Sequence, residues 1–141
     1  MKQITLFCFA LLLISGNWPC NAQANKQAEA TSTVSAKVEI YYFHFTRRCA
    51  TCLSVEENAG KAVESLYADK VKKGEYSFKG INLDDDSSKS IAEKLGIGGQ
   101  TLLVVSGDKK IDITDKGFMN AHDLEKMKEE IKKAVELALK G

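Results

Sequence analysis

The sequence predicts an α/β domain built on a central mixed sheet of about four strands flanked by helices. A β-branched and aromatic run over 38–45 is typical of a buried strand. Apolar residues at helical spacing follow it, which is the pattern of an amphipathic helix packed on a sheet. A second strand and helix, a hairpin and a closing helix complete the order. This order gives a sheet with both parallel and antiparallel neighbours and helices on both faces.

The first strand is predicted from Val38 to Phe45 and ends at Thr46-Arg47-Arg48. The helix after it carries an apolar stripe formed by Cys52, Val55, Ala59, Ala62, Val63, Leu66 and Tyr67. Because the stripe begins at Cys52, Cys49 is expected at the amino end of the helix, where backbone N–H groups are free.

The second strand and helix are predicted at Tyr76–Leu83 and Lys89–Leu95. Between them lies the polar turn 84–88, which can cap the short helix, and the glycine-rich segment 96–99 then ends that helix.

The hairpin is predicted from the continuous apolar run Thr101–Val105, the turn 106–108 and the alternating segment Lys109–Thr114. A last helix is expected from about Ala121 to Leu139, with Asn120 as its N-cap. Its apolar face carries Leu124, Met127, Ile131, Val135 and Leu139.

The amino-terminal segment is typical of a secretory signal. Lys2 precedes an apolar run from Ile4 to Ile14, and the small-residue pattern Ala22-Gln23-Ala24 predicts cleavage after Ala24. The apolar run is shorter than the roughly 20 residues that span a bilayer, so no integral membrane segment is expected in the mature chain. We therefore expect a signal peptide at 1–24, a flexible leader at 25–36, a thiol-bearing domain at 37–141, and a periplasmic or secreted product.

Charge and cysteine content narrow the function classes. The chain has 20 Lys and Arg against 19 Asp and Glu, a formal net charge of +1, so nothing indicates a nucleic-acid partner. Of its 4 cysteines, Cys8 and Cys20 lie in the predicted signal. Processing would leave Cys49 and Cys52, and it would also remove the only proline and the only tryptophan.

The motif Cys49-Ala50-Thr51-Cys52 predicts the chemistry. A helix amino end stabilises a thiolate through free N–H groups and the helix dipole, and Arg47 and Arg48 add positive charge beside it. Cys49 is expected to be the exposed nucleophile, and Cys52, one turn into the helix, the resolving thiol that releases a mixed disulfide. A purely structural disulfide is disfavoured because so short a loop constrains little of the unfolded chain.

A metal site is the main alternative. Two thiolates fill half of a tetrahedral zinc shell, and the chain adds only His44 and His122 as further soft ligands. His44 is expected to face away from Phe43 because side chains alternate along a strand. A thiophilic ion on Cys49 and Cys52, with His44 as a third ligand, therefore stays open. The acidic turn 84–86 lacks the ligand spacing of a calcium loop, and the glycines of 96–99 follow a helix, the wrong order for a phosphate cradle.

These segments resemble the thioredoxin superfamily from about Lys37 to the carboxyl end. The resemblance rests on the strand leading into the CxxC motif, on Ile81-Asn82-Leu83-Asp84, on Ala92-Glu93-Lys94-Leu95-Gly96-Ile97 and on Thr101-Leu102-Leu103-Val104-Val105. It implies disulfide exchange with Cys49 attacking and Cys52 resolving. The segment His44 to Cys52 is similar to exported thioredoxin-like subunits of a nitrophenyl-compound nitroreductase family linked to organoarsenical resistance. That narrower resemblance implies electron supply to partner subunits.

Three positions depart from the superfamily pattern. Gln100 or Thr101 stands where a cis-proline usually borders the dithiol, and Thr101 is included among the candidate site residues for that reason. Arg48 replaces the usual tryptophan, and Phe43 stands where the preceding strand usually carries a buried acid. A proline ring at this position usually crowds the thiols. Its absence therefore leaves open how a substrate binds and whether metal ions are excluded.

The sequence thus predicts an exported thiol-disulfide oxidoreductase domain without a cofactor of its own, acting with a redox partner protein or with reductase subunits. Two alternatives stay open: a module that binds a thiophilic metal or metalloid, and a scaffold without catalysis that only docks partners.

Overall fold

The computed structural model describes residues 38–140. The predicted signal at 1–24 and leader at 25–36 lie outside the described residues and stay predictions.

The sheet has 4 strands in the order β2-β1-β3-β4. Its strands are β1 (Val38–His44), β2 (Tyr76–Asn82), β3 (Thr101–Ser106) and β4 (Lys109–Asp112). β1 runs parallel to β2 and antiparallel to β3, and β4 pairs antiparallel with β3. The predicted mixed sheet is therefore confirmed.

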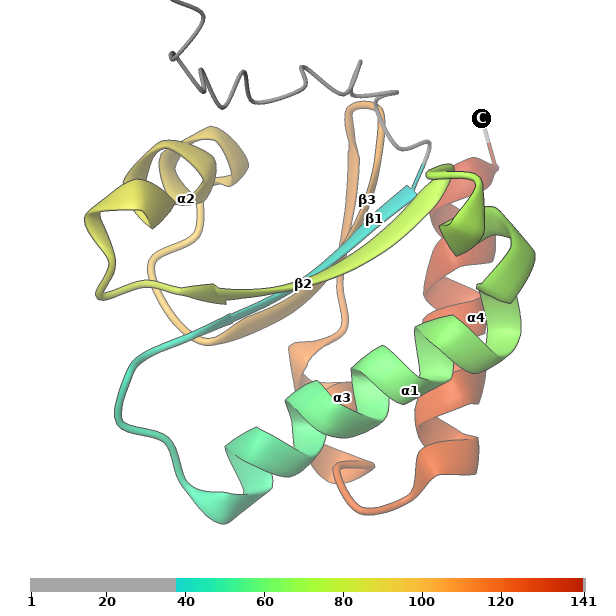
Figure 1. Ribbon diagram of the computed structural model, residues 1–141, viewed down its shortest axis with the longest axis horizontal. Coiled ribbons are helices and arrows are strands. Elements are labelled where there is room, and N and C mark those ends of the chain that lie inside the picture. The colour runs from blue at the N-terminus through green and yellow to red at the C-terminus, as the bar shows by residue number, and fades with distance from the viewer. Residues whose placement is uncertain (1–37, 141) are drawn as a thin grey trace, which may run out of the picture. The chain divides into compact units, whose positions relative to one another are not determined.

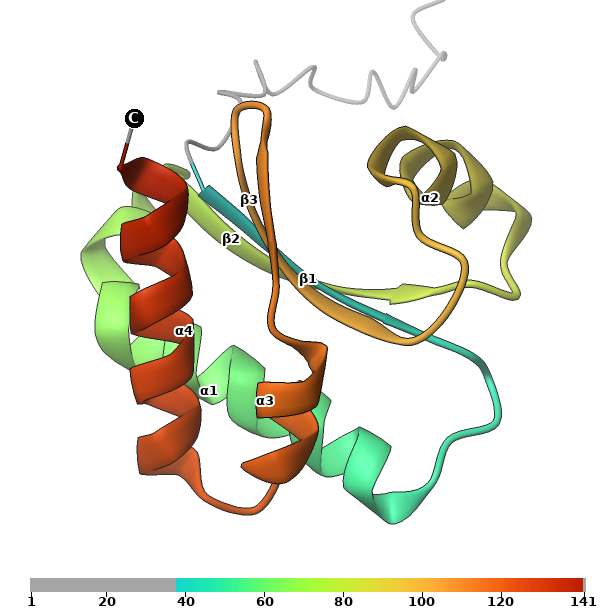
Figure 2. The same ribbon diagram turned by 180° about the vertical axis from the view of Figure 1, so that it is seen from behind.

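Helices cover both faces of the sheet (Figures 1 and 2). One face carries α1 (Ala50–Lys72), α3 (Thr114–Met119) and α4 (Leu124–Leu139), and the other carries η1 (Asp86–Ser88) and α2 (Lys89–Leu95). Among residues 38–140, no helix is both long and apolar enough to cross a lipid bilayer.

Strand β1 divides the core because its side chains alternate between the two faces. Ile40 and Tyr42 belong to the larger core beneath α1 and α4, whereas Tyr41 and Phe43 belong to the smaller core beneath α2. All four of these side chains are buried, which explains the continuous apolar sequence of the strand. The next side chain in the alternation, His44, lies on the α1 side, as its contact with a helix α1 residue shows.

Helix α1 places the dithiol at the carboxyl end of β1. Cys49 is its N-cap, and the buried residues of the helix are Cys52, Val55, Ala59, Ala62 and Val63, as the apolar stripe predicts. The helix continues to Lys72, beyond the predicted stripe, with one non-helical residue at Tyr67.

The predicted elements after the hairpin are partly wrong. Strand β4 ends at Asp112 because the Asp112 carboxylate accepts hydrogen bonds from the backbone N–H and the hydroxyl of Thr114, which starts the short helix α3. The last helix begins three residues later than predicted, at Leu124, and its N-cap is Asp123. Asn120, the predicted N-cap, instead ends α3 and donates to the Lys116 carbonyl.

Candidate functional site: a dithiol at a helix amino end

The two cysteines occupy different environments on one helical turn. Cys49 is exposed, whereas Cys52 is buried with 5% of its surface accessible. The Sγ of Cys49 accepts a hydrogen bond from the backbone N–H of Cys52 at 3.4 Å, which caps α1 and places the sulfur at the positive end of the helix dipole. The two Sγ atoms are 2.6 Å apart. The pair can therefore form an intramolecular disulfide with little backbone movement.

Contacts inside the site favour the anionic form of the buried sulfur. The side chain of Cys49, and less strongly that of Gln100, lower the pKa of Cys52, while burial acts in the opposite direction. The net shift is downward. The Cys52 thiol therefore loses its proton more readily than an ordinary cysteine thiol does.

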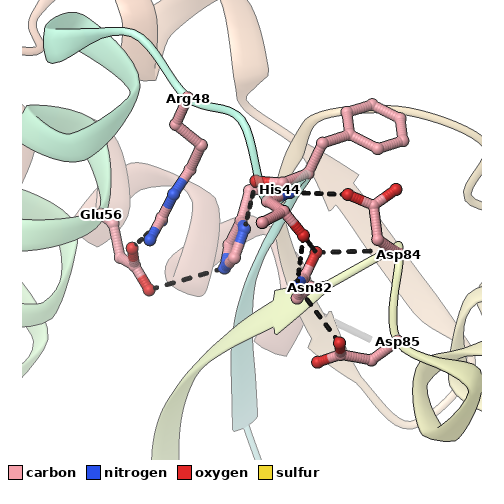
Figure 3. A network of polar contacts seen from close by, with 8 residues as sticks. His44, Arg48, Glu56, Asn82, Asp84 and Asp85 are labelled. Carbon is pink, nitrogen blue, oxygen red and sulfur yellow. Dashed lines mark hydrogen bonds and ion pairs between the residues drawn. The ribbon is translucent and has the colours of Figure 1, made fainter.

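The two arginines before the dithiol have different surroundings. Arg47 is exposed. The guanidinium of Arg48 forms a close ion pair with the carboxylate of Glu56, one turn after Cys52 on α1 (Figure 3). Part of the positive charge that the sequence predicts beside Cys49 is therefore balanced within the site. Arg47, Arg48, Cys49 and Cys52 are adjacent in the chain and at the same helix end, and their predicted roles stay predictions.

His44 lies next to this ion pair. Its Nδ1 donates a hydrogen bond of 3.0 Å to the Phe45 carbonyl, and its Nε2 is 3.9 Å from Oε1 of Glu56 (Figure 3). The imidazole thus faces a carboxylate on α1, on the side of the sheet that the alternation predicts. Within residues 38–140 no three His, Cys, Asp or Glu side chains form a group that could hold a metal ion. The alternative ligand set Cys49, Cys52 and His44 is therefore not assembled.

A second set of hydrogen bonds joins the loop before the dithiol to the end of β2. The backbone N–H of Thr46 donates to Oδ2 of Asp84 at 2.8 Å, and Nδ2 of Asn82 donates to the Thr46 hydroxyl at 3.0 Å (Figure 3). The hydrogen bond from the Thr46 backbone lowers the pKa of Asp84. Within the acidic turn 84–86, Asp84 therefore anchors the loop that precedes the dithiol.

The position usually held by cis-proline contains no cis peptide bond, and none occurs within residues 38–140. Thr101 is buried, its hydroxyl donates to the Gly99 carbonyl, and its strand partner Phe43 belongs to the α2 side of the sheet. The side chain of the preceding residue, Gln100, contributes to the lowered pKa of Cys52. Gln100 directly precedes β3, and side chains alternate along an extended segment, so Gln100 and Thr101 belong to opposite faces of the sheet. This alternation is the sequence signal that could have identified Gln100.

The structure also identifies the β1 side chain that points toward the dithiol side. Phe43, where the superfamily pattern has an acid, lies in the core beneath α2. Tyr42 lies beneath α1 instead, and its hydroxyl is fully enclosed. The superfamily pattern pointed to Phe43 and missed Tyr42. The length of the loop between the strand and the CxxC motif decides which strand residue lies beneath the helix.

A groove adjoins the loop on the α2 side of the sheet. Phe45, with 39% of its surface exposed, lines it together with the apolar residues Leu83, Ala92 and Ile97, with Gly98, and with the polar residues Ser88, Lys89 and Glu93. Large exposed apolar side chains often mark contact surfaces.

Comparisons with known proteins agree with the architecture. No protein-family model matches the chain, and no curated protein sequence matches it. Among solved structures, human ERp44 in its zinc-bound form matches with a TM-score of 0.50 and 14% sequence identity, over 70% of this chain and 26% of that chain. At this identity the likeness shows the fold alone, which is thioredoxin-like. The chain spans about a quarter of the length of that protein.

Proposed function

We propose that this chain is an exported thiol-disulfide oxidoreductase domain that passes electrons between protein partners. The observation that carries the proposal is the arrangement of its two thiols. The exposed Cys49 caps a helix of 23 residues, and the buried Cys52 has its sulfur 2.6 Å away.

The proposed reaction proceeds in two exchanges. The Cys49 thiolate attacks one sulfur of a partner disulfide, and the partner's other sulfur leaves as a thiolate. The Cys52 thiolate then attacks Cys49 in the mixed disulfide and releases the partner's first sulfur. Two electrons pass to the partner, the dithiol becomes a disulfide, and the protons of the two thiols end on the partner's cysteines. The reverse sequence oxidises a partner dithiol.

The compartment and the partner belong to the same proposal. The signal-like residues 1–24 support export of the chain. In the compartment that it reaches, a second exported redox protein would reduce the Cys49–Cys52 disulfide back to the dithiol. The resemblance of the segment 44–52 to exported nitroreductase-family subunits supports a partner that reduces an aromatic nitro group, with this chain as its electron donor. Such a partner would dock on the groove at Phe45, in the segment that leads to Cys49.

Trapping of the mixed disulfide tests the relay. In Cys52→Ser the attacking thiolate remains but resolution stops, so a tagged variant should accumulate covalent adducts with its partner in the producing cell. The adducts should disappear on reduction and should be absent from Cys49→Ser. Mass spectrometry of the excised adduct identifies the partner.

The same preparations examine the binding-module alternative. ERp44 was solved in a zinc-bound form, so zinc content of the anaerobically purified protein is the direct measurement. A stoichiometric metal ion that is lost in Cys52→Ser, without any adduct, would replace the relay with a thiophilic-ion carrier. Unchanged function of the double cysteine variant in the producing cell would favour a scaffold that only docks partners.

A further inference from the structure

The imidazole of His44 is a buried titratable group that the proposed exchange does not use. Only 8% of its surface is accessible, whereas His122, the second of the two histidines in the chain, is exposed. Histidine is the side chain that ordinarily gains or loses its charge near neutral pH. A buried histidine directly before the loop 45–48, which leads to the dithiol, can therefore make the surroundings of the dithiol depend on pH.

Hydrogen bonding fixes which ring nitrogen of His44 takes up a proton. The Phe45 carbonyl can only accept a hydrogen bond, so Nδ1 of His44, at 3.0 Å from it, carries a hydrogen. In the neutral ring Nε2 then has a free lone pair, which faces Oε1 of Glu56 at 3.9 Å. Two acceptors that face each other repel, whereas a proton on Nε2 turns the contact into an ion pair. A proton from solvent therefore binds at Nε2.

The carboxylate of Glu56 can hold both basic side chains at once. Its Oε1 faces His44, and its Oε2 pairs with the guanidinium of Arg48 (Figure 3). The two contacts use different oxygens, so a proton on His44 does not require the Arg48 pair to break.

The charged groups around His44 together favour a proton on it. Glu56 faces it from α1, and the charge of His44 is one of the smaller causes that lower the pKa of Asp84, after β2. Both carboxylates therefore attract a positive imidazole. The guanidinium of Arg48 opposes them, but it is paired with Glu56.

The neighbours of His44 on the two strands are neutral. Its partner on β2 is the amide Asn82. On β1 the ring of Tyr42 lies 5.9 Å away between centroids, and burial raises the pKa of that phenol, so it stays uncharged in the physiological range. Neither residue opposes a proton on the imidazole.

The ion pair that His44 joins lies beside the dithiol. Arg48 directly precedes Cys49, and Glu56 is four residues after Cys52 on α1, a spacing that places two side chains one turn apart on the same helix face. With His44 neutral, the charges of Arg48 and Glu56 cancel. A proton on His44 gives the group a net positive charge, and positive charge near a thiol favours its reactive thiolate form.

We propose that His44 is a proton-binding site that adds positive charge beside the dithiol in mildly acidic surroundings and thereby keeps Cys49 reactive there. The inference rests on the proposed function, in which Cys49 is the attacking thiol. The proton comes from solvent and forms only the Nε2–H bond of His44. No bond of the dithiol changes, and His44 acts on Cys49 through charge alone.

Nitrogen NMR of the two imidazoles tests the proton-binding site. The full chain is used with Cys8→Ser and Cys20→Ser under reducing conditions, and His44→Asn assigns the signals. In the neutral ring of His44 we expect the hydrogen on Nδ1 and none on Nε2. Near pH 6.5, Glu56→Gln should lower the fraction of His44 rings that carry both hydrogens by about threefold, because the facing negative charge is lost.

Two controls accompany this measurement. Glu57→Gln neutralises the next carboxylate on α1, which pairs with Lys61, and should leave the protonated fraction of His44 unchanged. The exposed His122 should respond to neither substitution. A protonated fraction of His44 that Glu56→Gln leaves in place would overturn the proton-binding site and would leave the relay untouched.

Alkylation of Cys49 by iodoacetamide tests the effect on the nucleophile. His44→Asn removes the group that takes up a proton and keeps a side-chain N–H that can donate to the Phe45 carbonyl. Near pH 5.5, where an ordinary histidine is mostly charged, this variant should react about threefold more slowly than the parent. Near pH 8 the two rates should be equal. His122→Asn should match the parent at both pH values.

The outcomes distinguish the two proposals. If Cys49 of the parent reacts no faster than Cys52, the relay has the wrong nucleophile. If Cys49 is the faster thiol and His44→Asn matches the parent at both pH values, the relay stands and the role of His44 is wrong. Slowing by an equal factor at both pH values would indicate a packing defect and would equally overturn the inference.

Discussion

The carboxylate of Glu56 lies over Gly80, in the space that a side chain at residue 80 would fill. A Cβ built at Gly80 would overlap Oε1 of Glu56 and would lie 3.8 Å from Nε2 of His44. The absence of a side chain at Gly80 thus admits the carboxylate that pairs with Arg48, directly before Cys49. Gly80 of the sheet and Glu56 of α1 together fix the surroundings of the loop 45–48, which precedes the dithiol.

Gly80→Ala tests this relationship by its coupling to Glu56. The added methyl group should displace the carboxylate from Arg48 and lower the free energy of unfolding by about 1–2 kcal/mol. In a Glu56→Ala background the same substitution should cost little, because the displaced group is gone. Urea unfolding of the two single variants and the double variant measures this coupling.

Gly98→Ala is the matched control, because nothing lies within 4 Å of a Cβ at that position. It should leave the free energy of unfolding unchanged in both backgrounds. An equal cost of Gly80→Ala with and without Glu56 would contradict the structural relationship.

The Arg48 and Glu56 pair should act on the nucleophile in opposite directions. Arg48→Gln removes a positive charge and should slow the alkylation of Cys49 by iodoacetamide at neutral pH, whereas Glu56→Gln removes a negative charge and should accelerate it. The double variant should react at close to the parent rate. Mass spectrometry of the alkylated protein gives the three rates. Rate changes of the same sign in both single variants would show that loop distortion, rather than charge, controls the thiol.

Much of this site could be predicted from sequence, and the reasons differ between its parts. Cys49 and Cys52 were recognisable because a strand, a CxxC motif and a helix stripe are consecutive in the chain, so local spacing places both thiols at the helix end. The mixed sheet followed from the order of the elements. Both features follow from the order of motifs and elements along the chain.

The contacts that sequence reasoning missed join distant segments. Glu56 lies against Gly80 on another element, and Thr46 contacts Asp84 across 38 positions of sequence. Tyr42 was missed because the superfamily pattern pointed to its neighbour Phe43, which faces the other core. One residue of strand register decides which side chain reaches α1, and periodicity alone does not fix that register.

The short helix α3 illustrates the same limit for secondary structure. Asp112 and Thr114 could continue an alternating strand, but their mutual hydrogen bonds turn the chain, and the Thr114 hydroxyl accepts from the backbone N–H of Leu102. Gly117 then fits against Leu102, where a Cβ would approach its side chain to 2.7 Å. Packing against β3 therefore selects a helix that has no periodicity of its own.

The N-cap of α4 provides a direct test of this correction. The Asp123 carboxylate accepts from the backbone N–H of Lys126 at 3.1 Å. Asp123→Ala should lower the midpoint of thermal unfolding by a few degrees, because a helix N–H loses its acceptor. Asn120→Ala, at the residue predicted from sequence as the cap, should lower it less. The reverse order would restore the sequence-based assignment.

Asp84, which anchors the loop before the dithiol, should make the stability of the fold depend on pH in acid. Its pKa is lowered in the folded protein, chiefly by the hydrogen bond from the Thr46 backbone. A lowered folded-state pKa means that the carboxylate stabilises the fold fully above its unfolded value, about 3.9, and that this contribution is lost as pH falls through the folded value. Urea midpoints of the parent should therefore decrease more steeply below about pH 4 than those of Asp84→Asn.

Asp108→Asn is the control for Asp84, since it changes a carboxylate in the β3–β4 turn, at the opposite end of the sheet. This variant should keep the pH dependence of the parent. A parent and an Asp84→Asn variant with parallel acid profiles would show that the Thr46 contact contributes nothing to stability.

Gln100 and Thr101 differ in what they do beside the dithiol, and a pair of variants separates them. The Gln100 side chain contributes to the lowered pKa of Cys52, so Gln100→Leu should raise that pKa and move the pH midpoint of the resolving step upward. The Thr101 hydroxyl donates to the Gly99 carbonyl. Thr101→Val should therefore lower the free energy of unfolding by about 1 kcal/mol while leaving that midpoint in place. Reaction with dithiobis-nitrobenzoate releases one nitrothiobenzoate when Cys49 attacks and a second when Cys52 resolves the mixed disulfide. The pH dependence of the second release gives the midpoint for both variants, and urea unfolding gives their stability. If Thr101→Val moves the midpoint and Gln100→Leu does not, Thr101 rather than Gln100 influences the pKa of Cys52. The role assigned to Gln100 would then be wrong.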